Sequence, residues 1–380
     1  MTSAPTKEQP AMLAEYLRRR IAAEGPLPLD EFMADALTHP DLGYYVTRDP
    51  LGVKGDFITA PEVSQMFGEL LGLWAAVQWR ALGAPNPVRL VELGPGRGTL
   101  MADALHAARL VPGFLDAVRV EFVEISPALR ARQKETMATR APGVSVAWHD
   151  WIGDVPDGPA IVLANEFFDA LPVRQFVRTP SGWRERLVDA SADGRLVFAY
   201  SDVGQPVVPP TWDDVLGDVV EDGVVEVSPA TAAIAGLIGE RLARFGGAAL
   251  IVDYGHAQSA PGDTLQAVRA HERDEPLAAP GEADLTAHVD FAALAHAGAR
   301  AGVRALGPVA QGAFLQRLGI DARAAMLMDK AAPDVARDVK LAHHRLTSPE
   351  AMGTLFQVLA FIHPDMPEPP GFAPETTDAG

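Results

Sequence analysis

Residues 88–100 read Val88-Arg89-Leu90-Val91-Glu92-Leu93-Gly94-Pro95-Gly96-Arg97-Gly98-Thr99-Leu100, and this stretch decides the fold. The part before Gly94 is a compact apolar run that predicts a buried strand, and the residues after Thr99 have helical periodicity. Glycines between a strand and a helix permit a tight turn and let backbone N–H groups approach a ligand closely. We therefore predict that Gly94, Gly96 and Gly98 bind a cofactor, with a purely structural turn as the alternative.

The spacing of these glycines narrows the choice of cofactor. Thr99 stands where the dinucleotide-binding fingerprint requires its third glycine. A nicotinamide or flavin dinucleotide, with its pyrophosphate, is therefore disfavoured. Open α/β folds bind ligands at this end of the sheet, so we expect a different ligand in the same place.

The segments around the glycine turn alternate between strands and helices. Strands are predicted at 118–123, 144–148 and 160–164, and helices at 100–110 and 128–139. This alternation is typical of a parallel sheet covered by helices. Turn signals separate three further strand candidates at 173–179, 183–188 and 196–200, which predicts an antiparallel insertion before 248–252 returns to the sheet. The predicted fold class is α/β and Rossmann-like, with helical additions at both ends.

The chain divides into four regions on this pattern. Residues 1–84 are expected to form an N-terminal helical region, and residues 85–310 the core, with the β-rich insertion at about 173–226. Residues 311–363 are predicted to form a C-terminal helical region that packs on the core. The segment 364–380 is rich in proline and poor in apolar residues, so we expect a disordered tail.

Polar and aromatic residues follow the second and third predicted strands of the core. Glu124 ends the second strand, where a carboxylate can accept hydrogen bonds from both hydroxyls of a ribose. Asp150 and Trp151 end the third, and they combine an acceptor for an adenine amine with an aromatic face for stacking. Taken singly, Glu124 could be a surface charge and Trp151 a core residue. Together they predict an adenosine site without a pyrophosphate, which fits S-adenosylmethionine.

Two carboxylates follow the fourth predicted strand, in the sequence Asn165-Glu166-Phe167-Phe168-Asp169. If Glu166 begins a helical turn, Glu166 and Asp169 are three residues apart and share a face. Paired carboxylates beside a sulfonium suit a cationic acceptor, because they can bind a guanidinium bidentately and balance its charge. We predict that Glu166 and Asp169 are catalytic and that Asn165 binds the cofactor. A helix start at which acids favour the helix dipole is the alternative.

The composition limits the partners and the location. The chain has 380 residues, with 32 lysines and arginines against 50 aspartates and glutamates, so its net charge is −18. This excess repels phosphate backbones and favours a cationic partner, so nucleic acid is not expected. The absence of cysteine excludes disulfides and thiolate metal sites, and no motif has metal-ligand spacing, so no metal is expected. Since no apolar run is long enough to cross a bilayer and no signal peptide is evident, we expect no membrane insertion and a cytoplasmic location.

Several motifs along the chain resemble those of a known family. They are Gly55-Asp56-Phe57-Ile58-Thr59, the glycine turn, residues 165–173, Asp253-Tyr254-Gly255, residues 281–286 and residues 311–315. Nearly the whole chain resembles the MidA family of mitochondrial complex I assembly factors and their bacterial homologues. The resemblance implies a class I S-adenosylmethionine-dependent methyltransferase, located in the mitochondrial matrix in the eukaryotic members. It also implies methylation of an arginine in a protein partner, the 49-kDa-type subunit of complex I, during assembly of that complex.

The same resemblance points to a loop near the cofactor. The segment with Asp56 and Thr59 precedes the helix predicted from Pro61 and could fold over the methionine end of the cofactor, so both residues are predicted to bind it. A simple turn near a helix start is the alternative. Two other functions remain open at this point. One is methylation of a small molecule, since fold alone does not assign a substrate, and the other is an assembly chaperone that binds S-adenosylmethionine without catalysis.

Overall fold

A mostly parallel sheet forms the centre of the molecule. The computed structural model describes residues 9–47, 59–269 and 271–372. The sheet has eight strands, in the order β15-β16-β10-β5-β2-β3-β4, with β14 paired to the end of β10. Their bounds are β2 (Val88–Leu93), β3 (Val118–Val123), β4 (Val146–His149), β5 (Ala160–Asn165), β10 (Gly247–His256), β14 (Val289–Asp290), β15 (Arg304–Ala310) and β16 (Phe356–Ile362). The predicted α/β, Rossmann-like sheet is confirmed.

The order of the strands determines where a ligand can bind. The strands β10, β5, β2, β3 and β4 run parallel to one another, whereas β16 is antiparallel to both β10 and β15. From β2 the chain builds outward to β4 and then crosses back to place β5 on the other side of β2. In open sheets a ligand crevice forms at the carboxyl ends of the strands where the order reverses. The residues predicted to bind the cofactor after β2, β3, β4 and β5 therefore share one edge of the sheet.

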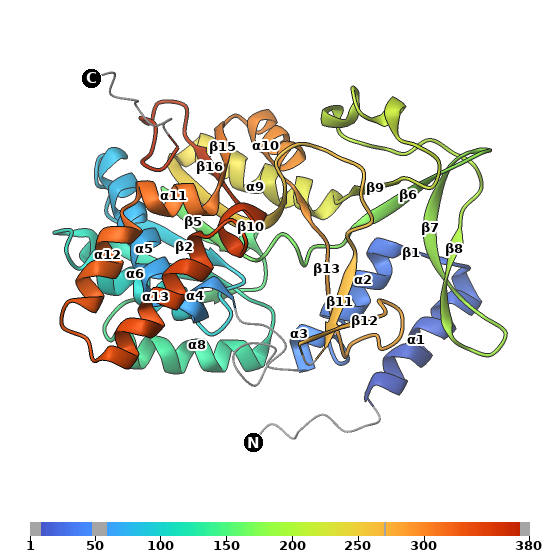
Figure 1. Cartoon of the computed structure of the whole chain (residues 1–380), viewed down its shortest axis with the longest axis horizontal. Helices are drawn as coiled ribbons and strands as arrows, with labels where there is room; N and C mark the ends of the chain where they lie inside the picture. The colour runs from blue at the N-terminus through green and yellow to red at the C-terminus, as the bar shows by residue number, and fades with distance from the viewer. Residues whose placement is uncertain (1–8, 48–58, 270, 373–380) are drawn as a thin grey trace.

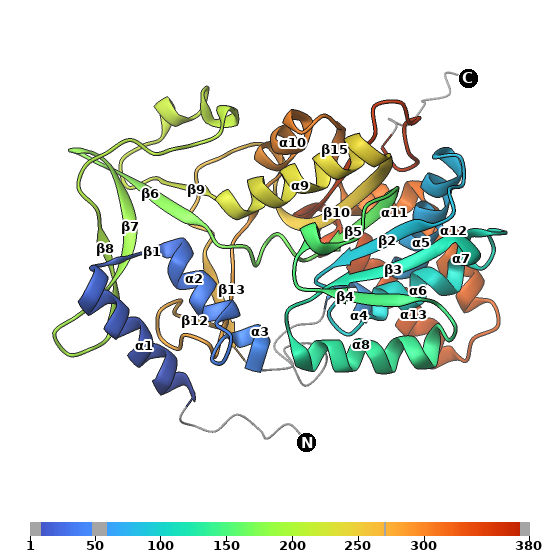
Figure 2. The same cartoon turned by 180° about the vertical axis from the view of Figure 1, so that it is seen from behind.

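Helices cover both faces of the sheet (Figures 1 and 2). The first face is covered by α5 (Gln65–Ala81), α6 (Thr99–Ala108) and α8 (Pro127–Arg140), and the second by α9 (Pro229–Phe245) and α10 (Phe291–Arg300). Successive residues of a strand point to opposite faces, so Ile161 and Leu163 of β5 pack under the first set and Val162 under the second. None of the helices in the described ranges is long and apolar enough to span a membrane.

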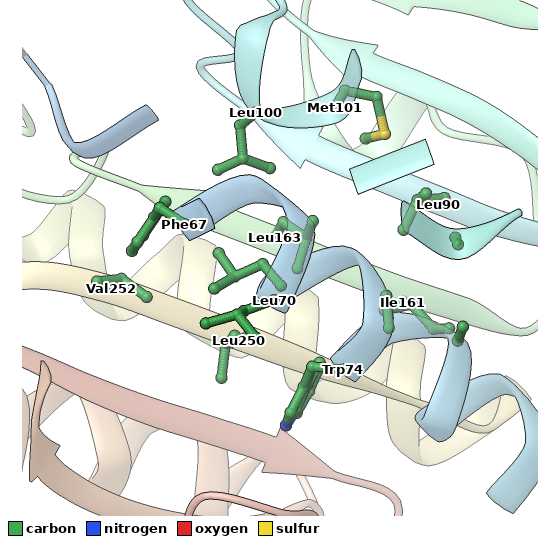
Figure 3. Packing of buried hydrophobic residues seen from close by; sticks show 14 of the residues in the cluster. Phe67, Leu70, Trp74, Leu90, Leu100, Met101, Ile161, Leu163, Leu250 and Val252 are labelled. Atoms are coloured by element: carbon green, nitrogen blue, oxygen red, sulfur yellow. The ribbon is translucent and has the colours of Figure 1, made fainter. Parts of the chain in front are cut away.

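Helix α5 packs in the hydrophobic core beside the central sheet. Figure 3 shows its side chains Phe67, Leu70 and Trp74 packed among buried residues of the sheet. Glycine lets α5 approach α6 closely, because a Cβ atom at Gly72 would lie 2.3 Å from the backbone oxygen of Ala104. The sequence predicts a single helical region over 1–84, but in the structure its two halves pack against different parts of the molecule. The part from α4 (Ala60–Val63) onward packs on the sheet, because α5 is apolar on nearly all sides.

The N-terminal helices belong to a different unit. The helices α1 (Gln9–Glu24), α2 (Leu29–Thr38) and α3 (Tyr44–Thr47) share a buried cluster with a small three-stranded sheet. Its strands are β11 (Gln266–Arg269), β12 (Glu272–Asp274) and β13 (Asp284–Thr286). We call residues 9–47 and 266–286 the accessory module. The sequence analysis did not predict this sheet, because its strands are too short to show a period-2 pattern.

The predicted antiparallel insertion lies between β5 and β10 in the chain. The strands β6 (Arg174–Thr179), β7 (Gly182–Ala190) and β8 (Leu196–Tyr200) form the expected meander, and β9 (Val224–Val227), which was not predicted, pairs with β6. The strand β7 also pairs with β1 (Leu27–Pro28), which connects α1 to α2. The insertion is thereby joined to the accessory module.

Two predictions for the C-terminal part are wrong. Residues 311–363 are not wholly helical, because α11 (Gln311–Arg317), α12 (Ile320–Met328), α13 (Pro333–Thr347) and α14 (Met352–Leu355) are followed by β16 of the central sheet. A short run that is apolar on both faces cannot be told from a buried helix by periodicity alone. The predicted disordered tail is also wrong for its first part, since Met366 and Phe372 are only 4% and 8% exposed and pack on the core. Residues 373–380 lie outside the described residues.

Candidate active site

One cavity of about 350 Å³ lies at the carboxyl ends of β2, β3, β4 and β5. Most of the residues that the sequence predicts for the site line it, namely Thr59, Gly94, Gly96, Glu124, Asp150, Trp151, Asn165, Glu166 and Asp169. Gly98 is not among the lining residues, and Asp56 falls outside the described residues. The cavity thus brings together residues predicted to bind a nucleoside and residues predicted to be catalytic, although they follow different strands.

The glycine turn after β2 has a conformation that other residues rarely adopt. Gly94, Gly96 and Gly98 have φ angles of 58°, 53° and 78°, in the left-handed region that glycine enters without steric cost. A Cβ atom at Gly94 would also lie 3.0 Å from the ring of Phe167. Gly98 is the N-cap residue of α6, so the turn itself explains this glycine without any contact to a ligand.

Glu124 is a buried carboxylate just after β3. Its oxygens accept hydrogen bonds from the backbone N–H of Ser126, at 2.8 Å, and from Nε2 of Gln133, at 3.1 Å. Burial raises the pKa of Glu124, and these donors partly oppose the shift. Asp150 pairs with a guanidinium of α8 at 2.6 Å, and Trp151 is 46% exposed. An exposed indole near a buried carboxylate can stack on a base whose sugar hydroxyls reach that carboxylate.

Glu166 lies on the turn that follows β5, and it does not begin a helix. Its φ of 49° is left-handed, a conformation that costs a residue with a side chain roughly 1–2 kcal/mol. Its Oε1 accepts hydrogen bonds from the backbone N–H of Ala60, at 2.9 Å, and from Nδ2 of Asn165, at 3.1 Å. Burial raises the pKa of Glu166 to about 7. The helical argument for the acid pair is therefore wrong, yet both Glu166 and Asp169 line the cavity.

Asp253 of β10 holds this turn in place. Its Oδ2 accepts hydrogen bonds from the backbone N–H groups of Phe167, Phe168 and Asp169, at 3.1, 2.9 and 3.2 Å. Its Oδ1 accepts another from the backbone N–H of Tyr254, at 2.9 Å. Asp253 is fully buried, and buried carboxylates need such donors to be stable in the interior. These hydrogen bonds hold the backbone just after Glu166 and thereby support the left-handed conformation of Glu166.

Asp169 connects the same turn to the accessory module. Burial raises the pKa of Asp169 to about 6. Its carboxylate forms a hydrogen bond with the hydroxyl of Tyr254, which also interacts with Thr286 of β13. The backbone N–H of Ala287 donates to the carbonyl oxygen of Asp169 at 2.9 Å. The strand β13 is therefore attached directly to the turn that carries both predicted catalytic carboxylates.

Several buried polar atoms of the cavity have no partner within residues 9–47, 59–269 and 271–372. They are Oδ1 of Asn165, Oδ1 of Asp169 and Oε2 of Glu92. Buried polar groups are almost always hydrogen bonded, so these atoms point to contacts with a ligand. Burial, with the nearby charge of Glu124, also raises the pKa of Glu92 well above its usual range. A glycine turn, an aromatic face and several acidic groups together fit a nucleoside that carries a positive charge.

The structure adds residues that the motif analysis did not assign to the site. They are Tyr45, Glu62, Glu92, Tyr254, Asp284 and Thr286, which also line the cavity. Tyr254, Asp284 and Thr286 lie within motifs that carried the family resemblance, so the signal was present but their role was not evident. Local patterns could not connect these residues, because they come from separate elements that meet only in the folded chain.

Comparisons with known proteins identify the family. A family model for S-adenosyl-L-methionine-dependent methyltransferases matches residues 70–309. The chain is 40% identical over 392 aligned positions to the mitochondrial protein arginine methyltransferase NDUFAF7 homolog of Drosophila melanogaster, with 94% of this chain and 89% of that protein covered. It is 38% identical over 381 positions to the human mitochondrial protein arginine methyltransferase NDUFAF7, with 94% and 85% covered.

A solved structure agrees with the fold and with the ligand. The crystal structure of a protein from Burkholderia thailandensis bound to S-adenosyl-homocysteine has a TM-score of 0.80 and 30% identity to this chain. The alignment covers 98% of this chain and 96% of the Burkholderia protein. The predicted family, class I methyltransferase fold and cofactor are thus confirmed. The chain belongs to the family of S-adenosylmethionine-dependent methyltransferases that includes the mitochondrial NDUFAF7 proteins, and S-adenosylmethionine is its cofactor.

Proposed function

We propose that this methyltransferase modifies an arginine of a protein partner. The observation that carries the proposal is the carboxylate pair of half-buried Glu166 and buried Asp169, which lines the same cavity as the predicted nucleoside-binding residues. Buried carboxylates need a positive partner when they are charged, and a guanidinium can supply it with bidentate hydrogen bonds. The names of the Drosophila and human relatives, which are protein arginine methyltransferases, support the same acceptor.

We assign cofactor binding to the residues that the sequence predicts for it and that line the cavity, which are Thr59, Gly94, Gly96, Glu124, Asp150, Trp151 and Asn165. Glu124 would accept hydrogen bonds from the ribose hydroxyls, and Trp151 would stack on the adenine. Asp56 keeps its assignment from the sequence alone. Gly98 would support the turn. When bound, S-adenosylmethionine supplies an electrophilic methyl group on a positively charged sulfur.

The chain's own residues then have to align the acceptor and exclude water. Holding two reactants in a near-attack geometry can contribute about 7–11 kcal/mol to lowering the barrier. Glu166 and Asp169 would orient the guanidinium and keep its charge away from the attacking nitrogen. That nitrogen becomes acidic as its new bond forms, so a carboxylate whose pKa is about 6 or 7 can accept the proton. The turn that carries both carboxylates would therefore serve both orientation and proton transfer.

We further propose that the partner is the 49-kDa-type core subunit of respiratory complex I and that methylation accompanies assembly of that complex. This part rests on the family resemblance. The net charge of −18 is consistent with a basic segment as the acceptor and disfavours nucleic acid.

The test is mass spectrometry of that subunit from three kinds of cells. They are wild-type cells, cells that lack this protein, and deletion cells that express either the Glu166→Gln or the Glu135→Gln variant. The side chain of Glu135 on α8 is 71% exposed, so it is a matched control. We expect a methylated arginine that disappears in the deletion, returns with Glu135→Gln and does not return with Glu166→Gln. A subunit without a methylarginine that depends on this protein would contradict the proposal. Normal assembly with Glu166→Gln would instead favour the chaperone function.

A further inference from the structure

Two residues of the accessory module line the cavity beside the proposed catalytic pair. Tyr45 and Asp284 are 239 residues apart in the sequence, and the hydroxyl of Tyr45 donates a hydrogen bond to Oδ1 of Asp284 at 2.8 Å. Asp284 is only 6% exposed. The cavity therefore contains a carboxylate that does not come from the central sheet, and a hydroxyl from a second distant segment orients it.

The local structure explains why both side chains face the cavity. In β13 the side chains alternate, so Leu285 enters the buried cluster of the accessory module while Asp284 and Thr286 line the cavity. Tyr44 is fully buried in the same cluster, and the next residue, Tyr45, lines the cavity. The apolar core of the module thus fixes the positions of the polar side chains next to it.

Tyr45 and Asp284 are also close to the turn that carries Glu166 and Asp169, since all four residues line the same cavity. Besides burial, the charges of Asp284 and Asp169 raise the pKa of Tyr45 well above its usual range. Tyr45 therefore remains a protonated donor, and two carboxylates from different units lie near one hydroxyl. The hydroxyl of Tyr254, which interacts with both Asp169 and Thr286, connects the units a second time. These contacts place Asp284 where an acceptor bound at Asp169 would meet it.

Carboxylates on two separate units suit a planar cation better than a compact one. A guanidinium presents several N–H donors in one plane, along more than one edge, and it stays charged in proteins. An ammonium group is a compact charge that one or two carboxylates can satisfy. A carboxylate from β13 can bind donors of a guanidinium that Glu166 and Asp169 do not reach.

We propose that Asp284, oriented by Tyr45, binds the acceptor guanidinium and makes the enzyme select arginine over lysine. The inference rests on the proposed function, because it assumes that the acceptor enters at Glu166 and Asp169. It adds that the accessory module, which is separate from the central sheet, determines the class of acceptor. Asp284 would touch the substrate, whereas Tyr45 would be a positioning residue that acts through Asp284.

The test measures binding of acetyl-arginine amide and acetyl-lysine amide to the full chain saturated with S-adenosylhomocysteine, by calorimetry. The variants are Asp284→Asn, Tyr45→Phe and the control Asp274→Asn, whose carboxylate pairs with Arg269 on the module away from the cavity. Asp284→Asn should weaken binding of the arginine compound by about tenfold or more, since hydrogen bonds to charged groups are lost. Tyr45→Phe should weaken it less, and binding of the lysine compound should change least. The control should behave like the wild type, and all variants should keep their affinity for S-adenosylhomocysteine.

The inference is overturned if Asp284→Asn binds S-adenosylhomocysteine and still binds the arginine compound as the wild type does. An equal loss for both compounds, or a wild type that binds neither, also overturns it. If Asp284→Asn does not fold, Tyr45→Phe decides, because it removes a single oxygen. Methylation by the wild type separates the two ideas. If the binding result holds but no arginine is methylated, the proposed function fails and only the binding of a guanidinium by Asp284 stands. If arginine is methylated and the variants bind normally, the proposed function stands and this inference fails.

Discussion

Asp253 accepts a hydrogen bond from the backbone N–H of Asp169 at 3.2 Å, although 84 residues separate the two. The same oxygen accepts the N–H groups of Phe167 and Phe168. One buried side chain of β10 thus fixes the backbone of the turn that presents both proposed catalytic carboxylates. Replacing a single acceptor should therefore disturb the positions of two side chains at once.

Asp253→Asn should reduce methyl transfer by about 10²-fold, since a displacement of the reacting groups by about 1 Å can cost this much. An asparagine has only one acceptor oxygen, and its amide would face backbone donors. Affinity for S-adenosylhomocysteine should be nearly unchanged, because Asp253 does not line the cavity. Single-turnover kinetics with calorimetry would check this, and Asp365→Asn, whose side chain is 92% exposed, is the control. Normal turnover in a folded Asp253→Asn protein would remove its positioning role.

Glu124→Gln should weaken binding of S-adenosylhomocysteine by about tenfold or more, because hydrogen bonds to a charged acceptor contribute about 1.5–3 kcal/mol. The amide keeps the shape of the side chain but loses the charge and one acceptor. Calorimetry on this variant, beside the exposed control Glu135→Gln, measures the effect. Unchanged affinity would mean that Glu124 serves only its contacts with Ser126 and Gln133.

The pH dependence of activity should follow the acid pair. The pKa values of about 7 for Glu166 and about 6 for Asp169 mean that the free enzyme gains its charged pair as the pH rises through this interval. Because the charged pair would bind the proposed cationic acceptor, kcat/KM should rise between about pH 5 and 8. A profile that is flat across this interval would show that neither carboxylate has to lose its proton.

The same shifts predict an opposite trend in stability. Both carboxyls bind protons more tightly in the folded chain than in the unfolded chain, whose pKa values are about 4.3 and 3.9. The free energy of unfolding should therefore decrease as the pH rises from about 4 to 7. Urea unfolding at a series of pH values would measure the slope. Glu166→Gln should make the slope shallower, whereas Glu135→Gln should leave it as in the wild type.

Close packing of α5 on α6 gives a prediction about stability alone. Gly72→Ala should lower the free energy of unfolding by about 1–3 kcal/mol, because its Cβ atom would lie 2.3 Å from a backbone oxygen of α6. Gly236 lies inside α9 with no atom within 4 Å of such a Cβ atom. Gly236→Ala should therefore raise stability by about 0.5–1 kcal/mol. Equal effects of the two substitutions in thermal unfolding would contradict the packing argument.

Local sequence patterns were sufficient to predict the strands and helices from β2 to β5 in the central sheet. An apolar run, a glycine turn and an amphipathic stretch after it predict a strand, a sharp turn and a helix, because each depends on neighbouring residues only. Carboxyl ends of parallel strands share one edge of a sheet, so Glu124, Asp150 and Glu166 could be expected near one another before any coordinates were known. The cofactor was predicted from these residues, whereas the family was predicted from the resemblance of several motifs to those of a known family.

Patterns failed where distant segments decide the structure. The strand β16 looks like any buried apolar run, and only its pairing with β10 and β15 makes it a strand. Glu166 and Asp169 meet at the cavity through Asp253, and no helical spacing is involved.

The sequence by itself determined the alternating strands and helices from β2 to β5 and the residues at their strand ends, because these depend on local periodicity and turn chemistry. Only the tertiary structure decided that Tyr45 and Asp284 share the cavity, because contacts across 239 residues leave no periodic trace. It also decided the raised pKa values of Glu166 and Asp169, since desolvation depends on everything packed around a carboxylate.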